Sequence, residues 1–265
     1  MSSLVRRLRR WPALLVPLSI AVSGPAPAQL RPPPPAPVTN ARAMAPQDLT
    51  GYWVSIVTED WRYRMMTPDK GDFAGVPLNA AGRAVVDKWD PAQDEASGEQ
   101  CRSYGAAAIM RVPTRLHITW DNDNELRVET DAGKQTRLFH FGGHPTGGEQ
   151  GWQGYSVASW EGLRQRGIGG VTATLGGKAE PEGYLTVITT NMKPGYLRKN
   201  GVPYSARARV EEYFDSFSEP NGDKWLVVTT VVTDPEYLVG NFITSSQFRR
   251  LPGPTGWDPR PCEAR

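Results

Sequence analysis

Short strand patterns recur through most of this chain, and they restrict the folds that it can adopt. Nine segments are rich in β-branched and aromatic residues: 52–58, 115–120, 125–130, 135–141, 152–160, 184–190, 207–217, 225–233 and 241–249. Compact turn sequences separate several of them, including Asp121-Asn122-Asp123-Asn124 and Asn221-Gly222-Asp223. Many short strands joined by such turns predict an antiparallel sandwich or closed barrel, and not a sheet of βαβ units.

One helix is predicted between the first and second strands. Asn79 is a residue type that often begins a helix, and Val85, Val86 and Trp89 then fall on one helical face. The helix should end at Asp90-Pro91, since a residue before proline avoids helical geometry. We expect this short helix to lie outside the sheet or across one end of it.

The N-terminal segment has the features of an export signal. Four arginines precede an apolar run too short to span a bilayer, and Ala26-Pro27-Ala28 offers a cleavage site before Gln29. We therefore expect a signal peptide at 1–28, a proline-rich linker at 29–46 and a single β domain at 47–265. An uncleaved anchor is the alternative. The predicted location is periplasmic or secreted, with no membrane span in the mature chain.

Charge and motif content exclude several classes of function. The chain has 30 Lys and Arg against 28 Asp and Glu, and four of those basic residues belong to the expected signal. The remainder has no basic patch of the kind that nucleic-acid binding requires. No phosphate-binding glycine loop, dinucleotide fingerprint or nucleophile motif is present, so no cofactor is predicted.

Two cysteines, Cys101 and Cys262, would lie in an oxidising compartment after export. One disulfide is the economical interpretation, and two free thiols are the alternative. A disulfide would attach the C-terminal tail to an early element. Neither cysteine has a second ligand at a spacing typical of a metal site.

The tripeptide Gly51-Tyr52-Trp53 opens the first strand, and Arg249 and Arg250 end the last one. This arrangement resembles the lipocalins and the wider calycin family of small antiparallel barrels. The resemblance implies a barrel of about eight to ten strands in which Trp53 closes one end and one of the two arginines packs across the indole. It also implies a small ligand inside the barrel and a tail disulfide. The insertion at 61–79 and the unrecognisable middle motif depart from the family pattern.

The residues 189–204 add a looser resemblance to exported bacterial proteins of unassigned function, and this stretch supplies no chemistry by itself. Within it, the length and irregularity of residues 191–204 are typical of a binding loop over a barrel mouth; a solvated connection is the alternative. With aromatic and cationic side chains elsewhere, it defines the predicted ligand-binding set: Trp120, Arg137, Tyr155, Trp160, Lys193, Tyr196, Arg198 and Tyr204. Such a cavity suits an apolar or aromatic ligand with an anionic group.

The three histidines are His117, His140 and His144. His140 and His144 have the spacing of two ligands on a helix, but they lie where a strand runs into glycines, so no metal site is predicted. On paired strands, His117 and His140 would approach each other inside the barrel and transfer protons near neutral pH. Outward-facing, solvated histidines are the alternative.

Three functions follow from these features. The favoured one is an exported lipocalin-like barrel that binds a small apolar or aromatic molecule. A cofactor-independent isomerase or lyase that uses His117 and His140 is the first alternative. An envelope-associated structural domain is the second. The sequence leaves open whether the protein is an enzyme and what its oligomeric state is.

Overall fold

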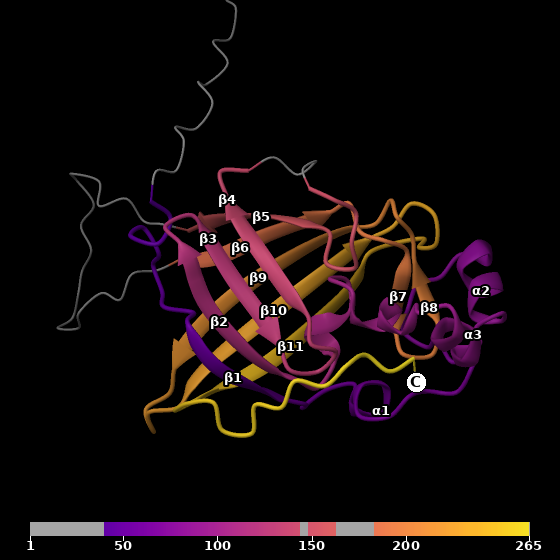
Figure 1. Cartoon of the computed structure of the whole chain (residues 1–265), viewed down its shortest axis with the longest axis horizontal. Coiled ribbons are helices and arrows are strands. Elements are labelled where there is room, and N and C mark those ends of the chain that lie inside the picture. Colours follow the sequence, from indigo (N-terminus) through magenta and orange to yellow (C-terminus); the bar gives the residue numbers. More distant parts are fainter. Residues whose placement is uncertain (1–39, 144–147, 163–182, 265) are drawn as a thin grey trace, which may run out of the picture. The chain divides into compact units, whose positions relative to one another are not determined.

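The nine predicted strands form a closed barrel with the strand order β1-β11-β10-β9-β6-β5-β4-β3-β2 (Figure 1). The computed structural model describes residues 40–143, 148–162 and 183–264, which belong to one compact unit. The barrel strands are β1 (Gly51–Ile56), β2 (Arg115–Asn122), β3 (Glu125–Thr130), β4 (Thr136–Phe141), β5 (Tyr155–Glu161), β6 (Tyr184–Thr190), β9 (Arg209–Ser218), β10 (Lys224–Thr233) and β11 (Phe242–Leu251). The predicted fold class, an all-β barrel of eight to ten strands, is confirmed. The expected signal 1–28 and residues 29–39 of the expected linker lie outside the described residues.

One strand pair in the barrel is parallel. β4 pairs with β5 in parallel, with Phe139 opposite Ser156, whereas each other neighbouring pair is antiparallel. A closed ring with an odd number of strands cannot alternate in direction all the way round, so nine strands require one parallel pair. β4 and β5 therefore both begin at the same end of the barrel.

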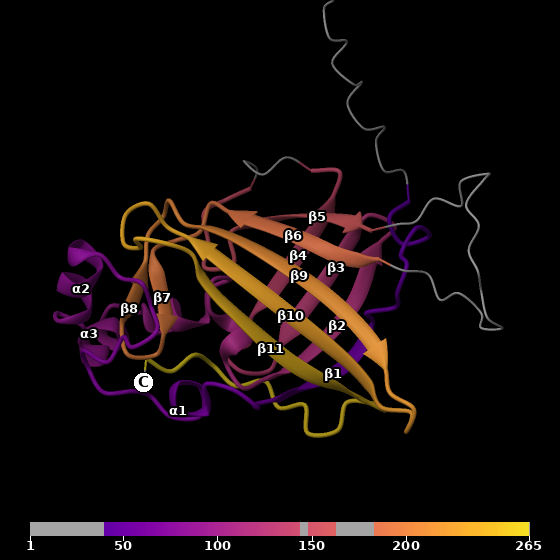
Figure 2. The same cartoon turned by 180° about the vertical axis from the view of Figure 1, so that it is seen from behind.

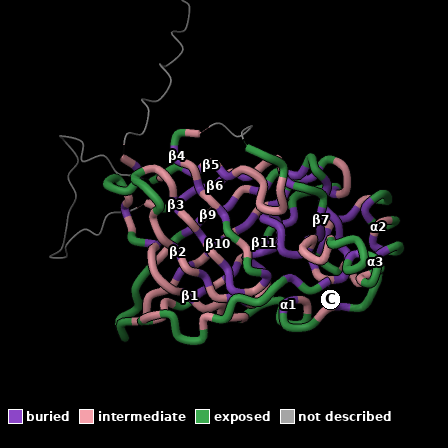
Figure 3. The backbone as a smooth tube through the Cα atoms, viewed as in Figure 1, coloured by how far each residue is buried: buried purple, intermediate pink, exposed green. Residues whose placement is uncertain are grey.

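Large side chains fill the barrel interior. Burial alternates along the strands, as in β10, where Leu226, Val228 and Val232 are buried between more exposed neighbours (Figure 3). The rings of Phe139 and Phe214 meet edge to face with centroids 5.4 Å apart. The bore is therefore a packed core over much of its length.

Trp53 is fully buried at the start of β1, and its indole nitrogen donates a hydrogen bond to the Leu49 carbonyl at 3.0 Å. The guanidinium carbon of Arg250 lies 5.7 Å from the indole ring centroid, and Arg249 points outward. Gly51 permits this approach: it has φ +107°, and a Cβ there would lie 3.1 Å from Nη2 of Arg250.

The two ends of the barrel differ. The β2–β3 and β9–β10 turns lie at one end, which we call the hairpin end. At the opposite end, the capped end, short elements from two connections cover the barrel (Figures 1 and 2). These elements, called the end cap, are α1 (Trp61–Arg64), α2 (Ala80–Val86), α3 (Pro91–Ala96), the 3-10 helices η1 (Gln100–Tyr104) and η2 (Ile109–Arg111), and the hairpin of β7 (Gly195–Arg198) and β8 (Val202–Tyr204).

The helix predicted from Asn79 is α2. The Asn79 side chain accepts a hydrogen bond from the Gly82 amide at 2.9 Å, as expected for a residue that begins a helix. The helix ends at Val86, and Asp90 starts α3 where the sequence predicted only a stop. Proline is well tolerated in the first turn of a helix, so Pro91 fits the start of α3. Within the described residues, no helix has the length and apolarity needed to cross a membrane.

The C-terminal tail returns from the hairpin end to the capped end along the outside of the barrel (Figures 1 and 2). Trp257 packs edge-on against Tyr52 of β1, and the Arg260 amide donates to the Asp131 carbonyl at 2.8 Å. Cys262 then forms the predicted disulfide with Cys101 in η1, with a sulfur–sulfur distance of 2.03 Å. The tail is thus attached to the end cap.

Candidate functional site

A pocket of about 730 Å³ lies where the capped end of the barrel, the end cap and the C-terminal tail meet. Its wall comes from segments that are far apart in the sequence. The lining residues are Val54, Ser55, Tyr63, Arg64, Met65, Met66, Thr67, Ser103, Tyr104, Ala108, Arg111, Val112, Pro113, Thr114, Arg115, Asp131, Ala132, Gly133, Leu197, Arg198, Lys199, Gly256, Asp258, Arg260, Pro261 and Glu263. Six of these are basic and three are acidic, so the lining carries an excess of positive charge.

Three buried arginines form one wall of this pocket. Arg64, Arg111 and Arg198 are only 7%, 6% and 5% exposed, and each is the last residue of a short element of the end cap: α1, η2 and β7. We call them the arginine triad. Arginines are rarely buried to this extent without partners that match their charge.

Direct contacts connect the members of the triad. Nε of Arg64 donates to the backbone carbonyl of Arg111 at 2.9 Å. Arg111 and Arg198 both face the ring of Phe242, with guanidinium carbons 5.4 and 5.9 Å from its centroid. Arg198 also stacks on Tyr63 at 4.1 Å. The aromatic faces hold the two cations in place, since such contacts are favourable when desolvated.

The triad lacks a full set of anionic partners. Within the described part of the chain, Asp60 is the acidic residue hydrogen-bonded to it, through Nη2 of Arg111 at 3.2 Å. Nη1 of Arg64 and both Nε and Nη1 of Arg198 are buried and have no hydrogen-bond partner. One carboxylate is therefore hydrogen-bonded to the three guanidinium groups, while Glu59 and Asp72 act on them at longer range, and buried donor capacity remains unused.

The electrostatic consequence appears in the pKa values of the triad. Burial lowers the pKa of Arg64 and of Arg198, and repulsion from Arg111 lowers both further. Burial also lowers the pKa of Arg111, against the opposing effect of Asp60. An anion bound between these groups would remove the repulsion that they now experience.

The backbone near Asp60 orients two members of the triad. Asp60 has φ 49°, an uncommon value for a residue with a side chain, and its carbonyl accepts from the Arg64 amide at 3.1 Å. The same residue begins α1 and binds Arg111 through its carboxylate. Backbone strain of this kind often accompanies a functional site.

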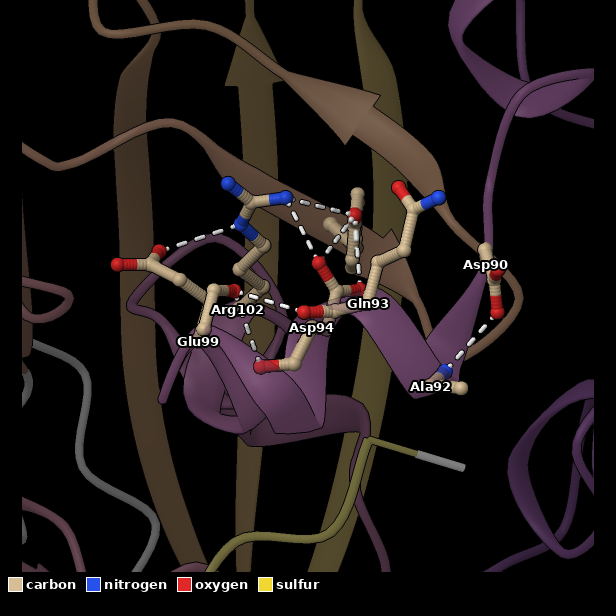
Figure 4. A network of polar contacts seen from close by, with 8 residues as sticks. Asp90, Ala92, Gln93, Asp94, Glu99 and Arg102 are labelled. Atoms are coloured by element: carbon tan, nitrogen blue, oxygen red, sulfur yellow. Dashed lines mark hydrogen bonds and ion pairs between the residues drawn. The ribbon is translucent and has the colours of Figure 1, made fainter.

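A polar network behind the pocket fixes β7. Oδ1 of Asp94 accepts from Nη1 of Arg102 at 2.8 Å, and Oδ2 accepts from the Tyr196 hydroxyl at 3.0 Å (Figure 4). Burial raises the pKa of Tyr196, and the Asp94 charge adds to this effect. Since Tyr196 lies two residues before Arg198, this network holds Arg198 at the pocket wall.

The predicted ligand-binding residues of the 189–204 stretch occupy different places. Arg198 lines the pocket, whereas Tyr196 lies behind it in the network with Asp94. Tyr204 is fully buried, its hydroxyl has no hydrogen-bond partner, and burial raises its pKa. Lys193 lies over the ring of Trp152, 5.5 Å from its centroid.

The other predicted ligand-binding residues lie elsewhere on the barrel. Arg137 is buried inside it and forms two hydrogen bonds with Glu212, at 2.9 and 2.5 Å. Trp120 and Trp160 flank Phe141 towards the hairpin end, each with ring centroids 5.5 Å from the phenyl ring. Tyr155 stacks on His140 at 4.6 Å. The structure does not bring these residues to the pocket.

The sequence predicted that His117 and His140 approach each other inside the barrel. The structure shows that they do not. His117 contacts Glu129 at 3.0 Å and stacks on Tyr52, and His140 lies opposite Glu125. Both imidazoles lie on the outer surface because the alternate residues of β2 and β4 form the buried face. Glu125 and Glu129 are four residues apart on β3, so their histidine partners are well separated. His144 lies outside the described residues, and the proton-transfer role stays a prediction.

No group of three or more histidine, cysteine, aspartate or glutamate side chains in the described ranges is arranged to hold a metal ion. The chemistry available at the pocket is instead that of anion binding. Sequence reasoning found Arg198 but not Arg64 or Arg111. The available signal was the length of the connection between β1 and β2, residues 57–114, since long ordered connections often contribute to binding sites.

Similarity to known proteins does not assign a ligand to this pocket. No protein-family model matches the chain, and neither a curated protein nor a solved structure matches it significantly. The residues of the pocket themselves are therefore the basis of the functional conclusion.

Proposed function

We propose that this chain is an exported binding protein for a small molecule with an anionic group and an apolar or aromatic part. The observation that supports it most strongly is the pocket of about 730 Å³ with the arginine triad in its wall. Its volume is in the range of small-molecule sites. The buried, unpartnered donors of Arg64 and Arg198 favour an anion at that wall.

The rest of the pocket suits an apolar group. Met65, Met66, Val112, Leu197 and Tyr104 also line it. Each methylene group that a ligand buries there contributes about 0.8 kcal/mol. Methionine side chains adapt to ligands of different shape, so this wall suits either a flexible aliphatic chain or a small ring.

Export and a lipocalin-like relationship belong to the same proposal. The Cys101–Cys262 disulfide supports an oxidising compartment. The contact of Arg250 with the Trp53 indole agrees with the lipocalin resemblance. The site that we propose differs from that family's expected one, because it lies at the capped end and not within the packed bore.

Native mass spectrometry of protein isolated from its natural source tests this function. We expect a bound molecule that is retained in the gas phase and is lost in the Arg198→Met variant. Arg207→Met is the matched control, because Arg207 is 65% exposed and pairs with Glu236 outside the pocket lining. Bare polypeptide in every preparation, with no small molecule that raises the melting temperature, would refute the proposal.

A further inference from the structure

The arginine triad has more positive charge than the protein itself neutralises. Of the acidic residues near it, Asp60 alone forms a hydrogen bond with a triad member in the described structure, and Asp72 pairs with Arg62 at 2.7 Å. Glu59 acts on Arg64 and Arg111, and Asp72 acts on Arg198, without a hydrogen bond to them, so a single carboxylate is hydrogen-bonded to the three guanidinium groups. A bound anion would add the hydrogen-bonded negative charge that the triad lacks.

The free donors of the triad also point to an acceptor with several oxygens. Nη1 of Arg64 and Nε and Nη1 of Arg198 come from two different side chains. A carboxylate presents two oxygens in one plane, which one guanidinium group can satisfy. A tetrahedral group presents three terminal oxygens in different directions, and so accepts from several arginines at once.

We infer that the anionic group bound by this pocket is a phosphate-type dianion, held by Arg64, Arg111 and Arg198. The inference rests on the proposed function and specifies its ligand class. Both a free phosphate ion and a phosphate monoester with an apolar substituent have this chemistry. Arginine suits such a group because its planar fork matches phosphate oxygens.

The positions of the acidic lining residues indicate which wall of the pocket would bind the dianion. Asp131, Asp258 and Glu263 belong to the barrel and tail side of the pocket. Asp131 is already paired with Arg115 and Asp258 with Arg260, so these carboxylates leave little cationic charge free on that side. The dianion is therefore expected at the triad, and the apolar part of an ester would extend towards Met65 and Met66.

Calorimetric titration of the intact protein with four probes tests the charge requirement. The probes are inorganic phosphate, inorganic sulfate, octyl phosphate and octanoate. We expect octyl phosphate to bind at least tenfold more tightly than octanoate at pH 8. Tighter binding of octyl phosphate than of inorganic phosphate identifies an ester as the ligand source, and equal binding identifies the free ion.

The pH dependence separates a dianion from a monoanion. The second phosphate pKa is about 6, so about a tenth of a phosphate monoester is dianionic at pH 5. We therefore expect octyl phosphate affinity to fall about tenfold from pH 8 to pH 5. Glu59, Asp60 and Asp72, the carboxylates that act on the triad, are the protein's own source of pH dependence. Sulfate keeps two charges at both pH values, so any change in its affinity measures the effect of the protein's own carboxylates.

Variants locate the bound ion. Arg198→Met and Arg64→Met should each weaken octyl phosphate binding at least tenfold. Arg260→Met is the control, because this arginine also lines the pocket but is 74% exposed and pairs with Asp258. If a triad variant does not fold, the comparison of octyl phosphate and sulfate binding to the parent protein at pH 8 and pH 5 still tests the inference.

Three results would overturn the inference: octanoate binding as tightly as octyl phosphate, an octyl phosphate affinity that does not change with pH relative to sulfate, or equal losses in Arg198→Met and Arg260→Met. Octanoate binding at the triad without phosphate binding would refute the phosphate assignment and leave the proposed function intact. Failure of all four probes overturns the phosphate assignment, and a natural ligand found by native mass spectrometry would then still support the proposed function.

Discussion

The buried arginines of this barrel differ in whether a carboxylate matches them. Arg137 and Glu212 are both fully buried and form a bidentate pair inside the barrel, with Thr189 as a third partner. Nε of Arg137 has no partner, and the same is true of donors on Arg64 and Arg198, but these two arginines have no carboxylate hydrogen-bonded to them in the described structure. The first arrangement is typical of a structural pair, and the second is expected where a ligand supplies the missing charge.

Glu212→Gln should destabilise the protein by about 3–5 kcal/mol, because it leaves Arg137 buried without a counter-charge. Urea unfolding measures this difference. Glu211→Gln is the matched control: the adjacent residue pairs with exposed Arg209, and surface pairs contribute about 0–1 kcal/mol. Equal effects in the two variants would show that the interior pair is not the structural element that we describe.

Arg198→Met should leave the ligand-free protein as stable as the parent, or more stable by up to about 2 kcal/mol. The change removes a buried charge that is repelled by Arg111 and inserts an apolar side chain against Tyr63 and Phe242. Thermal unfolding without ligand provides the measurement. A loss of stability comparable with that of Glu212→Gln would mean that Arg198 serves the fold and not a ligand.

The barrel strands were predictable because they obey a short-range rule. Alternation with period two places Leu226 and Val228 inside and their neighbours outside, and this pattern is visible in the sequence. For β4, the sequence did not show which of its two faces points into the barrel. Arg137 shares a face with Phe139 and lies inside because Glu212 of a distant strand neutralises it. His140 consequently points outward.

The end cap could not be predicted in the same way. α1 has four residues and β8 has three, which is too short for a periodic pattern. Tertiary contacts hold these elements instead, as in the network of Asp94, Arg102 and Tyr196 (Figure 4). The arginine triad is formed entirely by such elements. Long connections therefore indicated a binding region without identifying its residues.

Tyr196→Phe should loosen the end cap and leave the barrel intact. It removes the hydroxyl that donates to buried Asp94, and an unsatisfied buried acceptor costs about 1–3 kcal/mol. Hydrogen exchange should accelerate in β7 and η1 but not in β10. Tyr213→Phe is the control, since that hydroxyl donates to Glu211 on the outer face. Uniform acceleration in both variants would contradict an independent role for the network.

The disulfide connects the overall stability of the molecule with the pocket. The bridge joins residues 161 apart in sequence and holds the tail that forms one wall. Replacing both cysteines by serine should cost about 2–5 kcal/mol. Ligand affinity should also fall, because the tail backbone around Pro261 would no longer be held at this wall of the pocket. Calorimetry of the reduced and oxidised protein measures both the free energy of unfolding and the ligand affinity. Unchanged affinity after reduction would exclude the tail from the site.

A crystal structure of the protein isolated from its natural source tests the account most directly. We predict a bound molecule in the pocket at the capped end, with its anionic group within hydrogen-bond distance of Arg64 and Arg198. A molecule bound elsewhere, or a well-ordered pocket that contains only solvent beside the arginine triad, would contradict the account.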